Sequence, residues 1–247
     1  MREFKYHSIR DEVRDLVAAL DVGDALPAER ALAATLGASR MTLRRAIDEL
    51  VREGLIVRRQ GAGTFVAEPK IAQSLAVSSF SEDMRRRGLE PSSRTLTLEE
   101  IHAGPQLGRR LQVSPSEHVL RVIRLRLADA APMAIETLHV PLGLVGDLTA
   151  EVLEEASFYE LLAAGGVRID HGVQEIEPTV TDEQESELLG VPLHSPAFLF
   201  ERTSFDVTGR PIEFVRSVYR GDRYKLTAQL RTHASADAPD GLVGGPT

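Results

Sequence analysis

The feature that most constrains this chain is a series of three short helical patterns near its start, followed by two β-prone runs. In the third pattern, apolar side chains recur at i, i+3, i+4, i+7 and i+8 from Leu43 to Val51, which is the spacing of one helix face. Ser39 is a good N-cap for this helix and Gly54 ends it. The pattern therefore predicts a helix with one buried face between these two residues.

Two further helices are expected before it. Ser8 is the expected N-cap of the first, whose apolar stripe stops before Gly23. The second begins around Leu26, with Pro27 acceptable in its first turn, and ends at Gly37. Because the second and third helices are joined by a tight turn that contains glycine, they predict a helix-turn-helix.

A β-hairpin is expected directly after the third helix. Residues 55–57 and 64–66 are two short β-prone runs, and the six residues between them include Gly61 and Gly63. Two such runs around a glycine-rich tip are typical of a hairpin. This hairpin would be the wing of a winged helix-turn-helix.

The rest of the chain predicts a second domain. We expect the first domain over residues 1–67, a linker of weak periodicity over 68–77, the second domain over 78–231 and a disordered tail over 232–247. Strands are expected over 119–127, 133–140, 173–179, 197–205 and 212–219, and helices over 78–88, 106–111, 151–164 and 181–189. Strands and helices without regular alternation favour an α+β domain with a largely antiparallel sheet.

The charge is distributed unevenly along the chain. The whole protein carries a formal charge of −8, yet residues 30–60 hold seven arginines against three acidic residues, which leaves +4. A short basic island on an acidic protein is typical of a local phosphate-binding surface. A solvated, charged helix face gives the same pattern.

Composition excludes several classes of protein. There is no cysteine, and the seven histidines form no His-x-x-x-His or His-Glu-x-x-His pair, so we expect no disulfide, no metal site and no cofactor. No apolar run approaches the roughly 18 residues of a membrane span, and charged side chains run through the first 20 residues. We therefore expect a cytoplasmic protein.

Four segments, in this order and spacing, resemble the GntR family of bacterial regulators over residues 7–67. They are Leu26–Arg30, Ser39–Arg44, Gly54–Ile56 and Gly61–Val66. The resemblance implies a homodimer that binds double-stranded DNA at a palindromic operator, with short GT-rich half-sites facing their AC complements. A twofold dimer presents two recognition helices to two related half-sites.

The expected DNA-binding residues follow from how a recognition helix enters the major groove with its N-terminal turns. Arg40 and Arg44 lie one helical turn apart and can reach base edges or phosphates, and Thr42 can touch a thymine methyl or a phosphate. A solvated helix flank is the alternative for the arginines. The expected set is Arg30, Ser39, Arg40, Thr42, Arg44, Arg58, Arg59 and Gly61.

Later segments resemble the HutC-type branch of the same family. They are Ser79–Gly88, Arg124–Asp129, Pro211–Phe214 and Tyr219–Tyr224. This resemblance implies a UTRA effector domain with a chorismate lyase-like fold, which forms much of the dimer and binds a small polar metabolite.

The same resemblance implies a set of effector-binding residues. Arg124 and Arg126 alternate along one strand, so they project to one sheet face and can grip an anion. An ion pair with Glu136 or Glu213 is the alternative. Residues 79–82 would present donors at a helix start, or form a plain capping box. The expected set is Ser79, Phe80, Ser81, Arg124, Arg126, Glu136, Tyr159, Glu213 and Tyr219.

We therefore expect a DNA-binding regulator, and a repressor rather than an activator, controlled by a small anionic metabolite. By analogy with the family a phosphorylated amino sugar is favoured, and a carboxylate such as urocanate, or a fatty acid, remains open. The alternative is an enzyme of chorismate lyase-like fold that acts on a small carboxylate. Since the sequence offers no cysteine nucleophile, metal motif or clear Ser–His pairing, we expect no enzyme activity.

Overall fold

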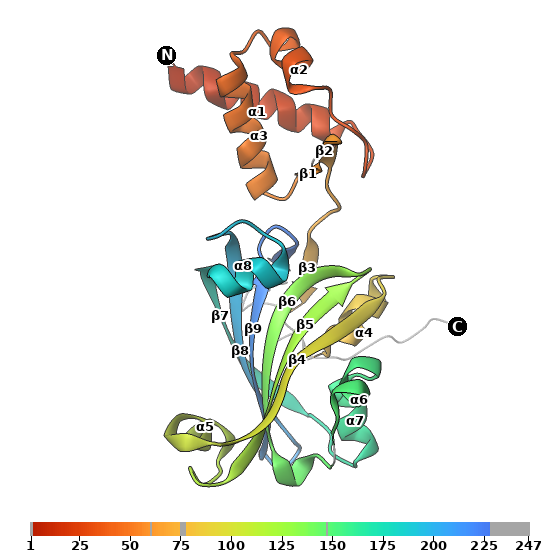
Figure 1. Cartoon of the computed structure of the whole chain (residues 1–247), viewed down its shortest axis with the longest axis vertical. Coiled ribbons are helices and arrows are strands. Elements are labelled where there is room, and N and C mark those ends of the chain that lie inside the picture. The colour runs from red at the N-terminus through yellow and green to blue at the C-terminus, as the bar shows by residue number, and fades with distance from the viewer. Residues whose placement is uncertain (1, 60, 75–77, 147, 228–247) are drawn as a thin grey trace, which may run out of the picture.

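The computed structural model describes residues 2–59, 61–74, 78–146 and 148–227. Helices α1 to α3 and the hairpin β1–β2 lie at one end of an elongated molecule, and a large twisted sheet with the remaining helices lies at the other (Figure 1). The two parts are joined by the segment that contains β3. The chain is therefore organised as the sequence predicts, although the exact domain boundaries stay predictions.

The N-terminal part is a winged helix-turn-helix, as predicted. Its helices are α1 (Arg2–Ala18), α2 (Glu29–Thr35) and α3 (Arg40–Arg52), and its antiparallel hairpin is β1 (Ile56–Arg59) with β2 (Gly63–Val66). These elements share one core, whose most buried members are Val13, Leu43, Ala46, Ile47, Leu50 and Ile56. All but Val13 and Ile56 belong to the apolar stripe that predicted the third helix.

The predicted starts of the first two helices are wrong. α1 already begins at Arg2, so Ser8 lies inside the helix, where its hydroxyl donates to Glu12 Oε1 at 3.0 Å. No glycine or proline precedes Ser8 to stop the helix from extending towards the N-terminus. α2 begins only at Glu29, because Leu26 donates its N–H to the Thr64 carbonyl at 2.8 Å and is held extended beside the wing.

The linker region contains a strand that the sequence did not predict. β3 (Ile71–Ser74) pairs in parallel with β10 (Tyr224–Thr227), near the other end of the described chain. Each strand is only four residues long, and its partner is remote in sequence, so neither shows a local period. Residues 75–77 and the predicted tail at 232–247 lie outside the described residues.

The C-terminal part is built on an antiparallel six-stranded sheet in the order β4-β5-β6-β9-β8-β7. Its strands are β4 (Pro91–His102), β5 (His118–Ala128), β6 (Ala131–Pro141), β7 (His171–Val180), β8 (Pro196–Phe205) and β9 (Pro211–Arg220). Five of these match the predicted strands. The edge strand β4 was missed, since none of its residues is buried and only half of its half-buried residues are apolar, which leaves no sustained apolar alternation.

Short helices flank this sheet. They are α4 (Phe80–Arg86), α5 (Gly104–Leu111), the 3-10 turn η1 (Leu142–Leu144), α6 (Ala150–Glu155), α7 (Phe158–Ala164) and α8 (Glu183–Leu189). The single helix predicted over 151–164 is wrong, because Ala156 is extended and Ser157 starts α7 afresh. α4, α6 and α7 lie on the same side of the sheet (Figure 1), and Leu153 and Phe158 join its core.

No helix within the described ranges is long and apolar enough to cross a membrane. The expected cytoplasmic location stays a prediction.

Candidate functional site

The first half of α3 presents an exposed surface. Ser39 caps the helix as predicted, with its Oγ accepting the N–H of Thr42 at 3.1 Å and lying 2.8 Å from Thr42 Oγ1. The buried side of α3 faces α1 and α2, which leaves Arg40 and Arg44 exposed on the other side. The helix can therefore approach another molecule with its N-terminal turns.

Three of the predicted arginines are available for an anionic partner. Arg30, Arg40 and Arg44 are exposed, and within the described ranges none of them has an acidic side chain within 4 Å. A guanidinium without a carboxylate partner keeps its full charge for phosphate or a base edge. These three side chains form the best supported part of the candidate DNA surface.

The wing arginines are less available. Arg58 pairs with Asp48 at 2.5 Å and with Glu29 at 3.3 Å, and the Arg59 guanidinium lies over the Phe65 ring, 4.7 Å from its centre. Gly61 has φ +73 and open space where a Cβ would stand, so its turn alone favours glycine. Arg58 would have to exchange protein carboxylates for phosphate in order to bind DNA.

Met41 is a candidate DNA contact that sequence reasoning missed. Its side chain is 76% exposed and lines a groove beside α3 together with Tyr6, Ile9, Ser39, Thr42 and Arg45. Methionine is usually read as a core residue. The missed signal is its position between Arg40 and Thr42, outside the buried stripe of the helix.

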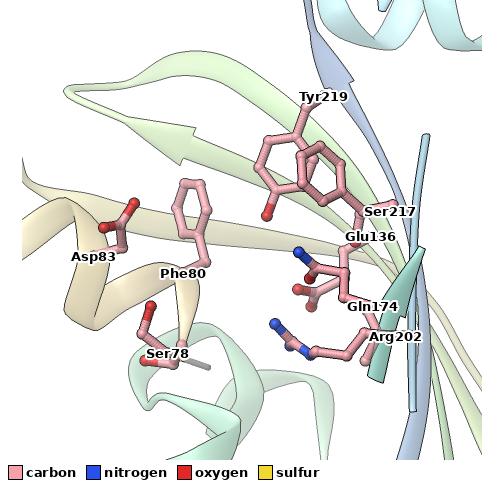
Figure 2. A pocket seen from close by; sticks show the side chains of 11 residues that line it. Ser78, Phe80, Asp83, Glu136, Gln174, Arg202, Ser217 and Tyr219 are labelled. Atoms are coloured by element: carbon pink, nitrogen blue, oxygen red, sulfur yellow. The ribbon is translucent and has the colours of Figure 1, made fainter. Parts of the chain in front are cut away.

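The second site is a pair of adjoining cavities between the start of α4 and the inner face of the sheet. In Figure 2, Phe80 and Ser78 approach from the side of α4, and Glu136, Gln174, Arg202 and Ser217 approach from the sheet. The first cavity is lined by Ser78, Ser79, Phe80, Asp83, Glu136, Gln174, Phe200, Arg202, Val215, Ser217 and Tyr219. The second shares Ser79, Phe80, Glu136, Arg202 and Val215 and adds Arg124, Arg126, Leu138, Ser157, Phe158, Tyr159 and Glu213.

The structure brings the predicted effector residues together. Eight of the nine line these cavities, and the ninth, Ser81, lies next to them with its Oγ accepting from Arg126 Nη2 at 3.1 Å. Ser79 caps α4 by accepting the N–H of Glu82 at 3.1 Å. Its hydroxyl is therefore already engaged in the capping role that was the alternative to anion binding.

Arg124 and Arg126 project to one face of the sheet, as their alternation predicts. Arg124 Nε donates to Glu136 Oε1 at 3.0 Å, and Arg126 Nη1 lies 3.8 Å from the same oxygen. Burial alone would raise the pKa of Glu136, but Arg124 and Arg126 outweigh it and lower this pKa to about 2. Burial, followed by repulsion from Arg124, lowers the pKa of Arg126 to about 10. Arg126 and Glu136 are therefore both charged at neutral pH.

A second buried network surrounds Glu213. Its Oε1 accepts from Tyr159 Oη at 2.7 Å and from Ser204 Oγ at 2.8 Å, and Arg202 Nη2 lies 3.5 Å away. Burial, and then the charge of Glu213, raises the pKa of Tyr159 well above its usual value. Tyr159 is therefore a neutral hydrogen-bond donor over the physiological range.

Arg202 is the main cavity residue that sequence reasoning missed. It alternates with Phe200 and Ser204 on one face of β8, so these side chains share the inner face of the sheet. Gln174 stands opposite Arg202 on the edge strand β7. The sequence did carry a signal for Arg202. Arg202 and Ser204 are polar residues two positions apart on the face of β8 that also carries the apolar Phe200.

The cavities carry a net positive charge. Arg124, Arg126 and Arg202 face Glu136 and Glu213, which leaves one positive charge uncompensated. The Nε atoms of Arg126 and Arg202 are buried and have no hydrogen-bond partner among the described residues. Asp83 does not change this balance, because it pairs with Arg87 at 2.8 Å and lies 3.6 Å from Arg86. Buried donors of this kind fit an anionic group.

Comparison with known proteins agrees with this division into two parts. Residues 5–66 match the gntR family of bacterial regulatory proteins, and residues 86–225 match the UTRA domain.

Several similar proteins are named as transcriptional repressors. The chain is 38% identical to the HTH-type transcriptional repressor NagR of Bacillus subtilis, over 81% of this chain and 82% of NagR. It is 34% identical to the mannosyl-D-glycerate transport/metabolism system repressor MngR of Escherichia coli, over 90% and 94% of the two chains. The crystal structure of PhnF from Mycobacterium smegmatis matches with a TM-score of 0.65 and 32% identity, over 90% and 99% of the two chains.

Proposed function

The chain belongs to the GntR family of bacterial regulatory proteins and carries a UTRA domain, and we propose that it is a repressor whose hold on operator DNA is controlled by a small anionic sugar derivative. The observation that carries this proposal is the buried, net positive cluster beside α4, with unpartnered Nε atoms on Arg126 and Arg202. A buried N–H donor without a partner is costly, so an anion that accepts these two remaining hydrogen bonds would be favoured.

The DNA half of the proposal rests on α3 and α2. Arg40 and Arg44 reach into the major groove from α3, and Arg30 contacts the backbone or a guanine from the start of α2. A homodimer would present two such surfaces to a palindromic operator. This arrangement is supported by the exposure of these three arginines and by the absence of an acidic partner for them among the described residues.

Within the cavity, the charged residues divide into two roles. Arg124 already gives Nε and Nη2 to Glu136, so we assign it to positioning that carboxylate. Arg126 and Arg202 are assigned to the anionic group. Gln174, Ser217 and Tyr219 line the same space and offer hydroxyl and amide groups to the hydroxyls of a sugar.

The anion is either a phosphate or a carboxylate attached to the sugar. The name of MngR refers to mannosyl-D-glycerate, a sugar joined to a carboxylic acid, and this supports an acidic sugar derivative here. We favour a phosphorylated amino sugar, for which Glu136 or Glu213 would meet the amine. A catalytic role finds no support in the relatives, which are named as repressors.

A thermal-shift screen tests the effector class directly. Sugar phosphates, sugar acids and the matching neutral sugars are added to the full chain, because a ligand that binds only the folded state raises the melting temperature. At a concentration 100 times its Kd the expected stabilisation is about 2.7 kcal/mol. The phosphorylated sugar should raise Tm and its neutral parent should not. Equal shifts for the two would refute an anion site.

Matched variants locate the ligand. Arg126→Met and Arg202→Met should lose the shift. Arg110→Met is the control, because Arg110 pairs with Glu201 away from the lining of both cavities.

A further inference from the structure

The turn between β9 and β10, Gly221–Arg223, lies directly against the end of the recognition helix. Gly54 follows α3 with φ +74, and a Cβ at this position would overlap the main-chain oxygen of Asp222. Backbone thus meets backbone at the junction of the two parts. Gly54 is required here both by its left-handed conformation and by this close approach.

Lys70 and Arg223 fasten the same turn to the linker. Lys70 Nζ donates to the Gly221 carbonyl at 2.7 Å, and Arg223 Nη2 pairs with Glu68 at 3.0 Å. Partial burial lowers the pKa of Lys70, while the carboxylates of Asp222 and Glu53 oppose this shift. One lysine therefore interacts with the effector domain and with the residue that ends α3.

The turn is also tied to the effector cavity. Tyr219 lines the cavity near the end of β9, and its neighbour Arg220 holds both oxygens of Asp222, at 3.0 and 2.7 Å. Arg220 is itself anchored on the carbonyls of Pro132 and Leu189, at 3.1 and 3.3 Å. Beyond the turn, Tyr224 contacts Tyr219 edge to face, with ring centres 4.6 Å apart.

We propose that the Gly221–Arg223 turn is a docking element that holds the winged helix-turn-helix on the effector domain and passes a displacement of Tyr219 to the end of α3. The docking contact stands on geometry alone, whereas its use in signalling rests on the proposed function. Arg220 is a positioning residue in this scheme, because it sets the place of Asp222.

The experiment measures the distance between the winged helix-turn-helix and the effector domain. Since the chain has no cysteine, Asp15→Cys on α1 and Gln184→Cys on α8 provide two exposed sites for spin labels. Labelled chain is mixed with an excess of unlabelled chain. Pulsed electron paramagnetic resonance then records only the distance between the two labels of one protomer. A docked domain gives one narrow distance distribution in the absence of any metabolite.

Gly54→Ala should broaden this distribution, since its Cβ displaces Asp222. The matched control is Gly23→Ala, a glycine with φ +87 in the same domain and open space where its Cβ would stand. The control carries similar backbone strain and should keep the narrow distribution. Lys70→Met removes only the ammonium donor and should also broaden it, which keeps the test decisive if Gly54→Ala fails to fold.

Arg220→Met tests transmission, because the contacts described for Arg220 lie within the effector domain. It should broaden the distribution although the residues that touch the DNA-binding part are unchanged. A broad wild-type distribution would overturn the proposal, as would a narrow one in both Lys70→Met and Arg220→Met. These results require no metabolite, so they are distinguishable from a failure of the thermal-shift screen.

Discussion

Arg124 donates from Nε and Nη2 to a single carboxylate oxygen of Glu136, at 3.0 and 2.5 Å, across the neighbouring strands β5 and β6. Both side chains are buried. This pair fixes a carboxylate that lies close to both Arg124 and Arg126 and lines the cavities beside α4.

Removal of Arg124 should destabilise the fold. Arg124→Met leaves the buried charge of Glu136 short of its main partner, and such losses cost about 3 to 5 kcal/mol. Urea unfolding of the variant measures this cost. The double variant Arg124→Met/Glu136→Met should recover only part of the loss, because it removes the unpaired carboxylate but leaves Arg126 buried without its carboxylate neighbour. A single variant as stable as wild type would contradict the pairing.

Acid should weaken the fold through Glu136. Its pKa is about 2 in the folded state against an ordinary value of 4.5. Its stabilising contribution is therefore complete above about pH 4.5 and is lost as the pH falls towards 2. At about 1.36 kcal/mol per pKa unit, this is on the order of 3 kcal/mol. Urea unfolding between pH 7 and pH 3 should show a smaller pH dependence in Glu136→Gln than in wild type.

The recognition-helix arginines should outweigh Arg58 in DNA binding. Arg40→Ala or Arg44→Ala should cost about 1 to 3 kcal/mol and relax sequence preference. Arg58→Ala should cost less, because Asp48 and Glu29 already share its charge, and its effect should be uniform across sequences. Fluorescence anisotropy measures the loss of affinity and its dependence on DNA sequence. It uses a duplex selected from a random pool, at several salt concentrations. Arg40→Ala that binds as tightly as wild type would refute the assignment of α3.

Met41 should read a thymine. An exposed apolar side chain among the arginines of a recognition helix can contact the 5-methyl group of thymine. Replacing each operator thymine by uracil should reveal one position where wild type loses affinity and Met41→Ala loses none. Arg52→Ala, near the end of α3, serves as the control variant. Equal losses in wild type and Met41→Ala at every thymine would exclude this contact.

The elements whose residues carry a local period were predicted from the sequence. The stripe of α3, its Ser39 cap and the strands β5, β6, β8 and β9 are of this kind, because burial leaves apolar positions in the sequence. β3, β10 and β4 were missed for the opposite reason. The first two depend on a partner about 150 residues away, and β4 lies at a polar edge. The edge strand β7 was predicted although none of its residues is buried.

The sequence predicted most of the residues that line the candidate site, but not how their side chains pair with one another. The alternation of Arg124 and Arg126 placed them on one face, yet it could not show that Arg124 is committed to Glu136 or that Arg202 enters from β8. The contact of Gly54 with Asp222 could not be predicted either. It depends on how two separately folded parts meet, and a glycine after a helix already has a sufficient local reason.

The most direct measurement follows operator binding by anisotropy while the metabolite from the thermal-shift screen is added to wild type, Arg126→Met and Arg202→Met. A repressor released by its effector should lose about 5- to 150-fold in operator affinity. Both variants should bind the operator like wild type without metabolite, because neither residue belongs to the candidate DNA surface, and should fail to respond at concentrations that release wild type. Release of both variants at the wild-type concentration would contradict the placement of the effector between α4 and the sheet.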